Sequence, residues 1–301
     1  MPRPLYLVIL AMAAAALLAS CRGASTPEDA RLRVVATIAP VGALAQAVAG
    51  DAVRLDVIAK AGVDPHEYQL KTADARAIAN AQLILRNGLG ADAFLDKALG
   101  NSKGTVVTIT DGLTLRDGAS GDGGSGHDPH VWHDPHNDIA MVEVIVKALA
   151  TADPAHAATF EANGRAYQER LRQTDREVQA LIEGIPPANR KMVTDHDAFG
   201  YFAARYGLTV VGTVIAGVTT GSEPSAASVA ALVQTIRREG VRAVFAESSV
   251  DPKIARRVAE ETNVRIVDDL YGDSLGAPGS GADTIEGMLL SNARKIADAL
   301  K

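Results

Sequence analysis

Short runs of β-branched and other apolar residues alternate with alanine-rich stretches from Leu32 to the end of the chain. This alternation predicts an α/β fold with mostly parallel sheets, because each strand is followed by a helix that returns the chain to the same edge. Eight strands are expected in two sets of four, at residues 33–38, 54–59, 83–86 and 105–109, and then at 191–194, 208–214, 243–246 and 265–267. The pattern therefore predicts two similar lobes, each a mostly four-stranded parallel sheet flanked by helices.

A long polar stretch separates the two sets of strands. Between Pro154 and Gly184 the apolar residues recur at intervals of three, four and seven, which places them on one face of a helix. Asp153 is expected to cap this helix, and Gly184 to end it. About 30 residues rising 1.5 Å each give a stiff rod of roughly 45 Å. The expected organisation is an N-terminal lobe at 32–152, a rigid linker helix at 153–185 and a C-terminal lobe at 186–301.

The beginning of the chain has the layout of an export signal. Residues 1–20 place one cation before an apolar run that ends at Leu18. That run, about 14 residues long, is too short for a stable transmembrane helix. Leu18-Ala19-Ser20 resembles the bacterial lipobox, which predicts acylation of Cys21 and a lipidated tether at 21–31. The expected location is outside the cytoplasm, anchored to the membrane by lipid; the alternative is an ordinary signal peptide whose cleavage region contains a cysteine.

Composition narrows the chemistry. Lys and Arg number 30 against 36 for Asp and Glu, a net charge of −6 without a basic cluster, which argues against a nucleic-acid partner. Cys21 is the only cysteine, so neither disulfides nor a thiolate metal site is expected in the rest of the chain. Four of the seven histidines lie within residues 127–136. Imidazole binds divalent metals, so this cluster suggests a metal site; a polar loop is the alternative.

Four side chains lie in loops that leave predicted strands, and His196 follows its strand directly. His66 follows the second strand, His130 the fourth, His196 the fifth and Asp273 the eighth. Open α/β sheets bind ligands at the carboxyl ends of their parallel strands. Because two of these residues come from each lobe, we expect a metal site in the cleft between the lobes.

His66 and His130 share an Asp-Pro-His setting, in which proline stiffens the loop and Asp64 or Asp128 could orient the imidazole. The remaining candidates are expected to have lesser roles. His127, His133 and His136 are expected to be solvated loop residues, with low-affinity metal capture at the cleft mouth as the alternative. Pro129 and Pro135 exclude one continuous helix there. His156 is expected to be exposed, Trp132 to pack beside the site, and Glu247 to cap backbone amides at the cleft.

Several motifs occur together in one order. They are the lipobox, Asp64-Pro65-His66-Glu67-Tyr68, Asn87-Gly88-Leu89-Gly90, Asp128-Pro129-His130-Val131-Trp132 with Asp134-Pro135, Asp195-His196-Asp197-Ala198-Phe199-Gly200-Tyr201, Glu223-Pro224-Ser225 and Tyr271-Gly272-Asp273-Ser274-Leu275. With these motifs, about residues 33–301 resemble the zinc/manganese substrate-binding lipoproteins of bacterial ABC transporters. The resemblance implies two α/β lobes bridged by a rigid helix, and a metal held by the residues that match His66, His130, His196 and Asp273.

The resemblance also implies a function. The chain would be no enzyme but a monomeric binding protein that captures Zn²⁺ and delivers it to a membrane permease with its ATPase, with a metallochaperone as a further partner. Manganese-associated members often carry a carboxylate where this chain has His196, and three imidazoles with one carboxylate suit tetrahedral zinc better than manganese. A manganese-binding counterpart is the alternative.

The chain departs from the family pattern in one place, and two rival functions are open. Many zinc members carry a long histidine-rich loop before the second ligand, whereas this chain has a short glycine-rich run ending in His127, so loop-assisted loading would be reduced. A zinc hydrolase could use Glu67 or Glu247 as a base, but neither lies in a helical HExxH arrangement. The other rival is a surface adhesin that metal merely stabilises.

Overall fold

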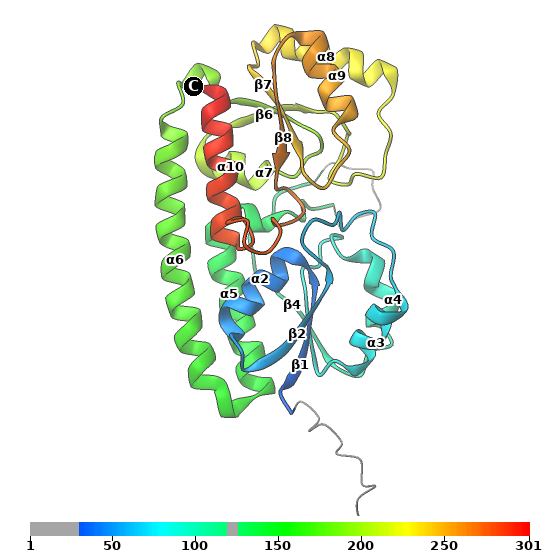
Figure 1. Cartoon of the computed structure of the whole chain (residues 1–301), viewed down its shortest axis with the longest axis vertical. Coiled ribbons are helices and arrows are strands. Elements are labelled where there is room, and N and C mark those ends of the chain that lie inside the picture. Colours follow the sequence, from blue (N-terminus) through cyan, green and yellow to red (C-terminus); the bar gives the residue numbers. More distant parts are fainter. Residues whose placement is uncertain (1–29, 119–125) are drawn as a thin grey trace, which may run out of the picture. The chain divides into compact units, whose positions relative to one another are not determined.

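A computed structural model describes residues 30–118 and 126–301 (Figure 1). The predicted signal peptide, Cys21, most of the tether and most of the glycine-rich run lie outside the described residues. Contacts divide the chain into two units, Met1–Arg31 and Leu32–Lys301, and the second unit contains all the strands and helices described. No helix among the described residues is both long and apolar enough to cross a membrane.

Two parallel sheets of four strands each form the framework. The first contains β1 (Leu32–Ile38), β2 (Val53–Ala59), β3 (Leu83–Arg86) and β4 (Thr105–Thr108) in the order β2-β1-β3-β4. The second contains β5 (Lys191–Thr194), β6 (Thr209–Thr213), β7 (Ala243–Glu247) and β8 (Arg265–Leu270) in the order β6-β5-β7-β8. The predicted fold class is therefore confirmed, and the two lobes repeat one strand order.

Helices cover both faces of each sheet. The first half contains α2 (Ala39–Ala49), α3 (Thr72–Asn80), α4 (Asp96–Leu99) and α5 (Pro135–Ala152), with short 3₁₀ turns η1 (Ala93–Leu95) and η2 (Val131–His133). The middle contains η3 (Pro154–His156), α6 (Ala157–Glu183) and η4 (Pro187–Asn189). The second half contains α7 (Gly200–Tyr206), α8 (Ala226–Glu239), α9 (Lys253–Thr262) and α10 (Ile285–Leu300).

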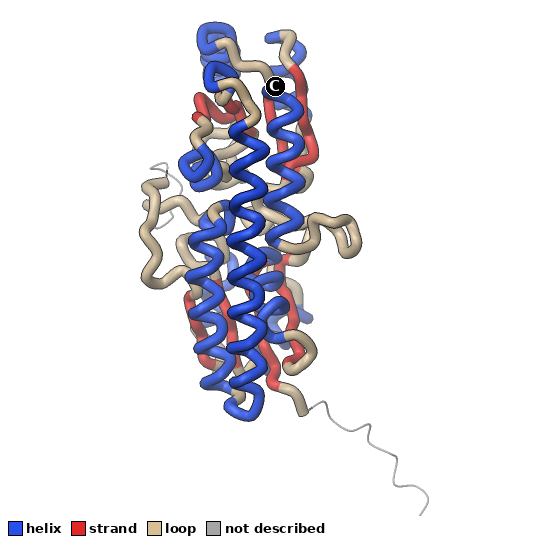
Figure 2. Tube along the Cα trace, turned by 90° about the vertical axis from the view of Figure 1, so that its left-hand side faces the viewer, coloured by secondary structure: helices blue, strands red, loops and turns tan. Residues whose placement is uncertain are grey.

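The long helix α6 packs against elements of both lobes. It lies between α5 and α10, which run beside it in Figure 2, and it also contacts α2 and α7. Its buried residues include Phe160, Tyr167, Leu171 and Val178, as the helical spacing predicts. The expected cap is wrong in one detail: the Asp153 carboxylate makes no capping bond to the backbone and instead contacts the His156 ring at 2.6 Å.

One hydrophobic core runs through both lobes. It contains Val34 of β1, Phe160 of α6, Phe245 of β7 and Leu300 of α10. Each sheet also has a separate cluster on its other face, since side chains alternate along a strand: Val35 joins the cluster under α3, whereas Val34 joins the shared core. Because one face of α6 is buried in the shared core, the helix holds the two sheets in one packed unit.

Candidate metal centre

Aspartates shape the loops that carry the candidate ligands. In the loop after β2, Asp64 Oδ1 accepts a hydrogen bond from the His66 amide at 2.8 Å. In the loop before η2, Asp128 Oδ1 accepts one from the His130 amide at 3.0 Å. Such side-chain-to-backbone bonds form tight local turns. The two Asp-Pro-His segments therefore hold the backbone of their histidines in the same kind of turn.

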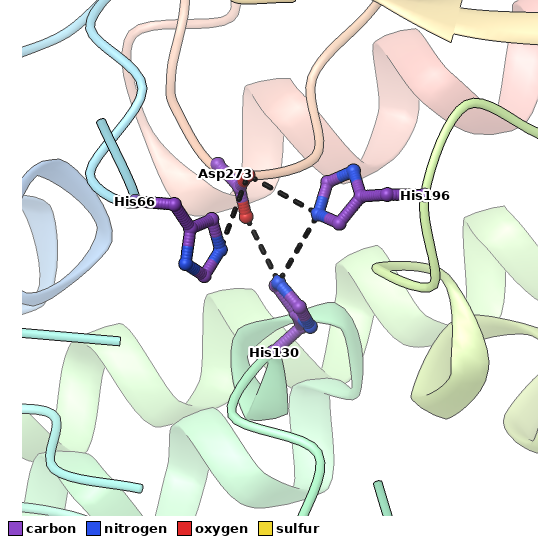
Figure 3. Close-up of side chains that lie close together, drawn as sticks. All are labelled: His66, His130, His196 and Asp273. Carbon is purple, nitrogen blue, oxygen red and sulfur yellow. Dashed lines mark hydrogen bonds and ion pairs between the residues drawn. The ribbon is translucent and has the colours of Figure 1, made fainter. Parts of the chain in front are cut away.

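The four predicted residues come together between the lobes, as Figure 3 shows. Asp273 lies at the centre: its Oδ1 is 2.9 Å from His130 Nε2, and its Oδ2 is 3.2 Å from His196 Nε2 and 3.5 Å from His66 Nε2. The four candidate ligand atoms lie within 4.8 Å of one another. Three imidazoles and a carboxylate thus face one small space.

These groups are buried. His130 and His196 are 0% exposed and Asp273 is 1% exposed. Within the described part of the chain, His66 Nε2 and both Asp273 oxygens have no hydrogen bond of acceptable geometry. A buried carboxylate needs a nearby cation, which a bound metal ion or, without metal, the protonated imidazoles beside Asp273 would supply. The donor set and its burial therefore fit a metal ion.

The histidines and carboxylates of the centre shift one another's pKa values. Burial lowers the pKa of His130, but the carboxylates of Asp273 and Asp128 outweigh it and raise this pKa to about 9. The pKa of His196 is also well above its ordinary value, because Glu247 and Asp273 outweigh the opposing effect of burial. Burial raises the pKa of Asp273, yet the three imidazoles hold it well below its ordinary value. In the metal-free site, protons therefore occupy positions that a metal would take.

Two carboxylates orient the imidazoles from behind. Asp128 Oδ1 lies 2.8 Å from His130 Nδ1, and Glu247 Oε1 lies 2.8 Å from His196 Nδ1. Each leaves the Nε2 of its histidine facing Asp273, an arrangement that fixes ring orientation in metal sites. Glu247 Oε2 also accepts the Asp273 amide at 2.9 Å, so it caps a backbone amide at the cleft, as expected.

The structure adds to the sequence reasoning at two aspartates. The Asp64 carboxylate accepts from the His66 amide and from the Thr220 hydroxyl at 2.6 Å across the lobes, so it shapes the loop instead of orienting the ring. Asp195 was not among the expected residues. It accepts the His196 amide at 2.9 Å and the Glu247 amide at 2.7 Å. Its position next to His196 was the only signal in the sequence.

The other histidines do not form one group. His133 is 0% exposed, so the expectation of a solvated loop residue is wrong. The η2 turn directs its ring inward against Phe199, with 4.9 Å between ring centroids. Burial and the neighbouring His130 charge lower the pKa of His133 to about 4, which keeps it neutral. His136 and His156 are exposed, as expected.

His127 and Trp132 have different surroundings. The half-exposed ring of His127 lies 3.9 Å from Asp117, beside the ends of the glycine-rich run. Trp132 is buried beside His130, with 5.4 Å between ring centroids, as the sequence predicted.

Gly272 has no room for a side chain. A Cβ added there would lie 2.0 Å from Glu247 Oε2. The Glu247 carboxylate cannot easily move away, because it contacts both the Asp273 amide and the His196 ring. We expect Gly272→Ala to destabilise the metal-free protein by about 1–3 kcal/mol, because overpacking forces neighbouring groups to shift.

Thermal unfolding followed by circular dichroism measures this effect, at roughly 2–4 °C per kcal/mol for a domain of this size class. Gly100→Ala is the matched control, since Gly100 has helical backbone angles and ordinary contact distances. Equal midpoints for the two variants would contradict the steric argument.

Comparison with known proteins places this geometry in a family. The model of the family described as "Zinc-uptake complex component A periplasmic" matches residues 34–299. The chain belongs to this family. Its members are substrate-binding components of ABC transporters, so the chain is the metal-binding component of such a transporter, with a permease and an ATPase as partners, and it is not an enzyme.

Individual relatives cover almost the whole chain. The metal ABC transporter substrate-binding lipoprotein ScbA of Streptococcus cristatus is 31% identical and aligns over 99% of this chain and 98% of its own length. The manganese ABC transporter substrate-binding lipoprotein PsaA of Streptococcus anginosus is 29% identical over 98% and 97%. The solved periplasmic zinc-binding protein TroA of Treponema pallidum is 30% identical over 90% and 99%, with a TM-score of 0.83.

Proposed function

We propose that the protein binds Zn²⁺ through His66, His130, His196 and Asp273 and delivers it to the permease. The observation that carries the proposal is the convergence of three imidazole Nε2 atoms and one carboxylate in a buried site between the lobes. Two residues come from each lobe, so a bound ion would tie the lobes together. All four positions would be protein ligands, which suits binding rather than catalysis by a metal-bound water.

The donor set favours zinc over manganese. Three nitrogen donors and a carboxylate are typical of zinc sites, whereas Mn²⁺ prefers a shell richer in oxygen. With neutral imidazoles and an ionised Asp273, the loaded site would carry a net charge of +1. The competing proposal is manganese, the metal named for the related PsaA. It is supported by the Asp273 carboxylate, both of whose oxygens face imidazoles and could bind together.

Elemental analysis combined with native mass spectrometry tests the proposal directly. Protein purified without added metal should carry one zinc per chain, and a competition titration should rank zinc above manganese at pH 7.5. A stoichiometric manganese content together with the opposite ranking would establish the manganese alternative. Binding of neither metal would overturn the proposed ligand set.

We also propose that Cys21 is acylated and that this lipid anchor holds the protein at the membrane, outside the cytoplasm. The lipobox supports this anchor, and so do related proteins named as lipoproteins. Cells fed an alkyne-tagged fatty acid should label the wild type, and Cys21→Ser should lose the label; labelling of both would contradict acylation at this residue.

We further propose that the protein is a monomer and accepts metal from a metallochaperone. Its N-terminal lobe would end at residue 152 and its linker helix at residue 185.

A further inference from the structure

One carbonyl joins the ligand loops of the two lobes. The Gly272 carbonyl accepts a hydrogen bond from Trp132 Nε1 at 2.9 Å and lies 2.9 Å from His133 Nε2. Trp132 and His133 follow the ligand His130 in η2, and Gly272 precedes the ligand Asp273. A carbonyl oxygen has two lone pairs, and both are used here.

The chemistry of this contact fixes the state of His133. A carbonyl oxygen can only accept, so the His133 Nε2 must carry a hydrogen and donate it. The other ring nitrogen, Nδ1, is buried without a hydrogen-bond partner in the described part of the chain. His133 therefore serves as a donor to the backbone, and its Nε2 is not available to bind a metal.

The same peptide group is held from its opposite side. The amide between Gly272 and Asp273 donates to Glu247 Oε2 at 2.9 Å. The other carboxylate oxygen, Oε1, lies 2.8 Å from His196 Nδ1. The peptide is thus fixed by the N-terminal lobe at its carbonyl and by the C-terminal lobe at its amide. Asp273 cannot shift relative to His130 unless these contacts break.

We propose that Trp132 and His133 are positioning residues that hold Asp273 in the metal site through the Gly272 carbonyl and thereby raise the affinity for zinc. The inference rests on the proposed function. A carboxylate that is already held among three imidazoles needs little ordering when the ion binds, and support of this kind typically changes metal affinity by 10–100-fold.

A matched pair of substitutions isolates the donor. His133→Met keeps an unbranched side chain of similar length but cannot donate, whereas His133→Gln can place an amide N–H near the original Nε2. We expect His133→Met to raise the Kd for zinc about tenfold, and His133→Gln to bind within about threefold of the wild type. Trp132→Phe, which removes the second donor, should act in the same direction as His133→Met.

The double variant His133→Met with Trp132→Phe should lose more affinity than the product of the two single losses, because the buried carbonyl then has no donor. Tyr167→Phe is the control, since it removes a buried hydroxyl bonded to Glu286 at 2.8 Å, between α6 and α10. We expect it to leave the Kd for zinc unchanged.

The possible outcomes separate the two claims. If the wild type binds zinc and His133→Met and Trp132→Phe bind it equally well, the inference is overturned and the proposed function stands. Failure of His133→Gln to restore binding would likewise overturn the role of the donor. If His133→Met does not fold, Trp132→Phe decides the question by the same measurement. A wild type that binds no zinc overturns the proposed function itself.

Discussion

Replacing His196 by alanine should lower the affinity for zinc by about 100- to 1,000-fold. Apparent binding free energies of four-ligand structural zinc sites are roughly 10–16 kcal/mol, so one ligand of four accounts for about 2.5–4 kcal/mol, and each 1.4 kcal/mol is tenfold. The His196 ring is 0% exposed and its Nε2 faces Asp273 at 3.2 Å. The alanine variant would leave an open side of the site without a nitrogen donor. Competition against a chelating indicator at pH 7.5 measures the loss.

His156→Ala is the matched control for this substitution. The His156 ring is half exposed and lies at the start of the linker helix, where it contacts the Asp153 carboxylate and the Phe160 ring. Its removal should leave the Kd for zinc unchanged. Equal affinities for the two variants would show that His196 is not a ligand. The affinity of His133→Met should fall between those of the two variants, because His133 acts on the metal site through the Gly272 carbonyl.

The edge of each sheet at which the candidate ligands lie could be predicted from the sequence. In a parallel sheet all the strands end at the same edge, so the exact bounds of a strand do not change where the loop after it begins. Once the strands before His66, His130, His196 and Asp273 are identified, the carboxyl ends of two parallel sheets fix where those residues lie. An error of a few residues in a strand end, such as that of β8, does not move the loop to another edge. Strand order therefore places two of the four residues at one edge of each sheet, and the packing of the lobes brings the two pairs together.

The direction of individual side chains could not be predicted in the same way. His133 and His136 lie three residues apart in one polar segment, yet the first is 0% exposed and the second contacts Arg205 at the surface. The difference arises from the η2 turn and from the Gly272 carbonyl, which lies 139 residues further along the chain. A contact at such separation leaves no local signal. The same holds for the contact between Glu247 and His196.

The hydrophobic core that both lobes share could not be predicted from the sequence pattern either. Periodicity indicates which face of α6 is buried, and Phe160 and Leu171 are buried as predicted. It does not indicate what covers that face. The shared core includes Met141 of α5 and Ile296 of α10, so the linker helix is packed along its length and is more than a stiff connection. Movement of the lobes would have to preserve this packing.

The affinity for zinc should fall by at least about tenfold for each pH unit between pH 7.5 and 5.5. Zinc binds the neutral imidazole, so every proton held by a ligand must be displaced, at a cost of tenfold in affinity per pH unit below its pKa. The pKa of His130 is raised to about 9, since the carboxylates of Asp273 and Asp128 outweigh the opposing effect of burial. The pKa of His196, beside Glu247 and Asp273, also lies well above its ordinary value. His130 therefore holds a proton at pH 7.5, and the neighbouring carboxylates favour the protonated form of His196 as well.

The sign follows from these two shifts. Raising the pH toward 9 removes competing protons and strengthens zinc binding, whereas lowering it weakens binding, with Asp273 remaining ionised because its pKa is held well below the ordinary value. Unperturbed histidines would lose affinity only near and below a pKa of about 6.5. Calorimetric titrations in buffers of different ionisation enthalpy should show release of at least about one proton per zinc at pH 7.5. Equal affinities at pH 7.5 and 5.5, or binding without proton release, would contradict three imidazoles as the ligands of the metal.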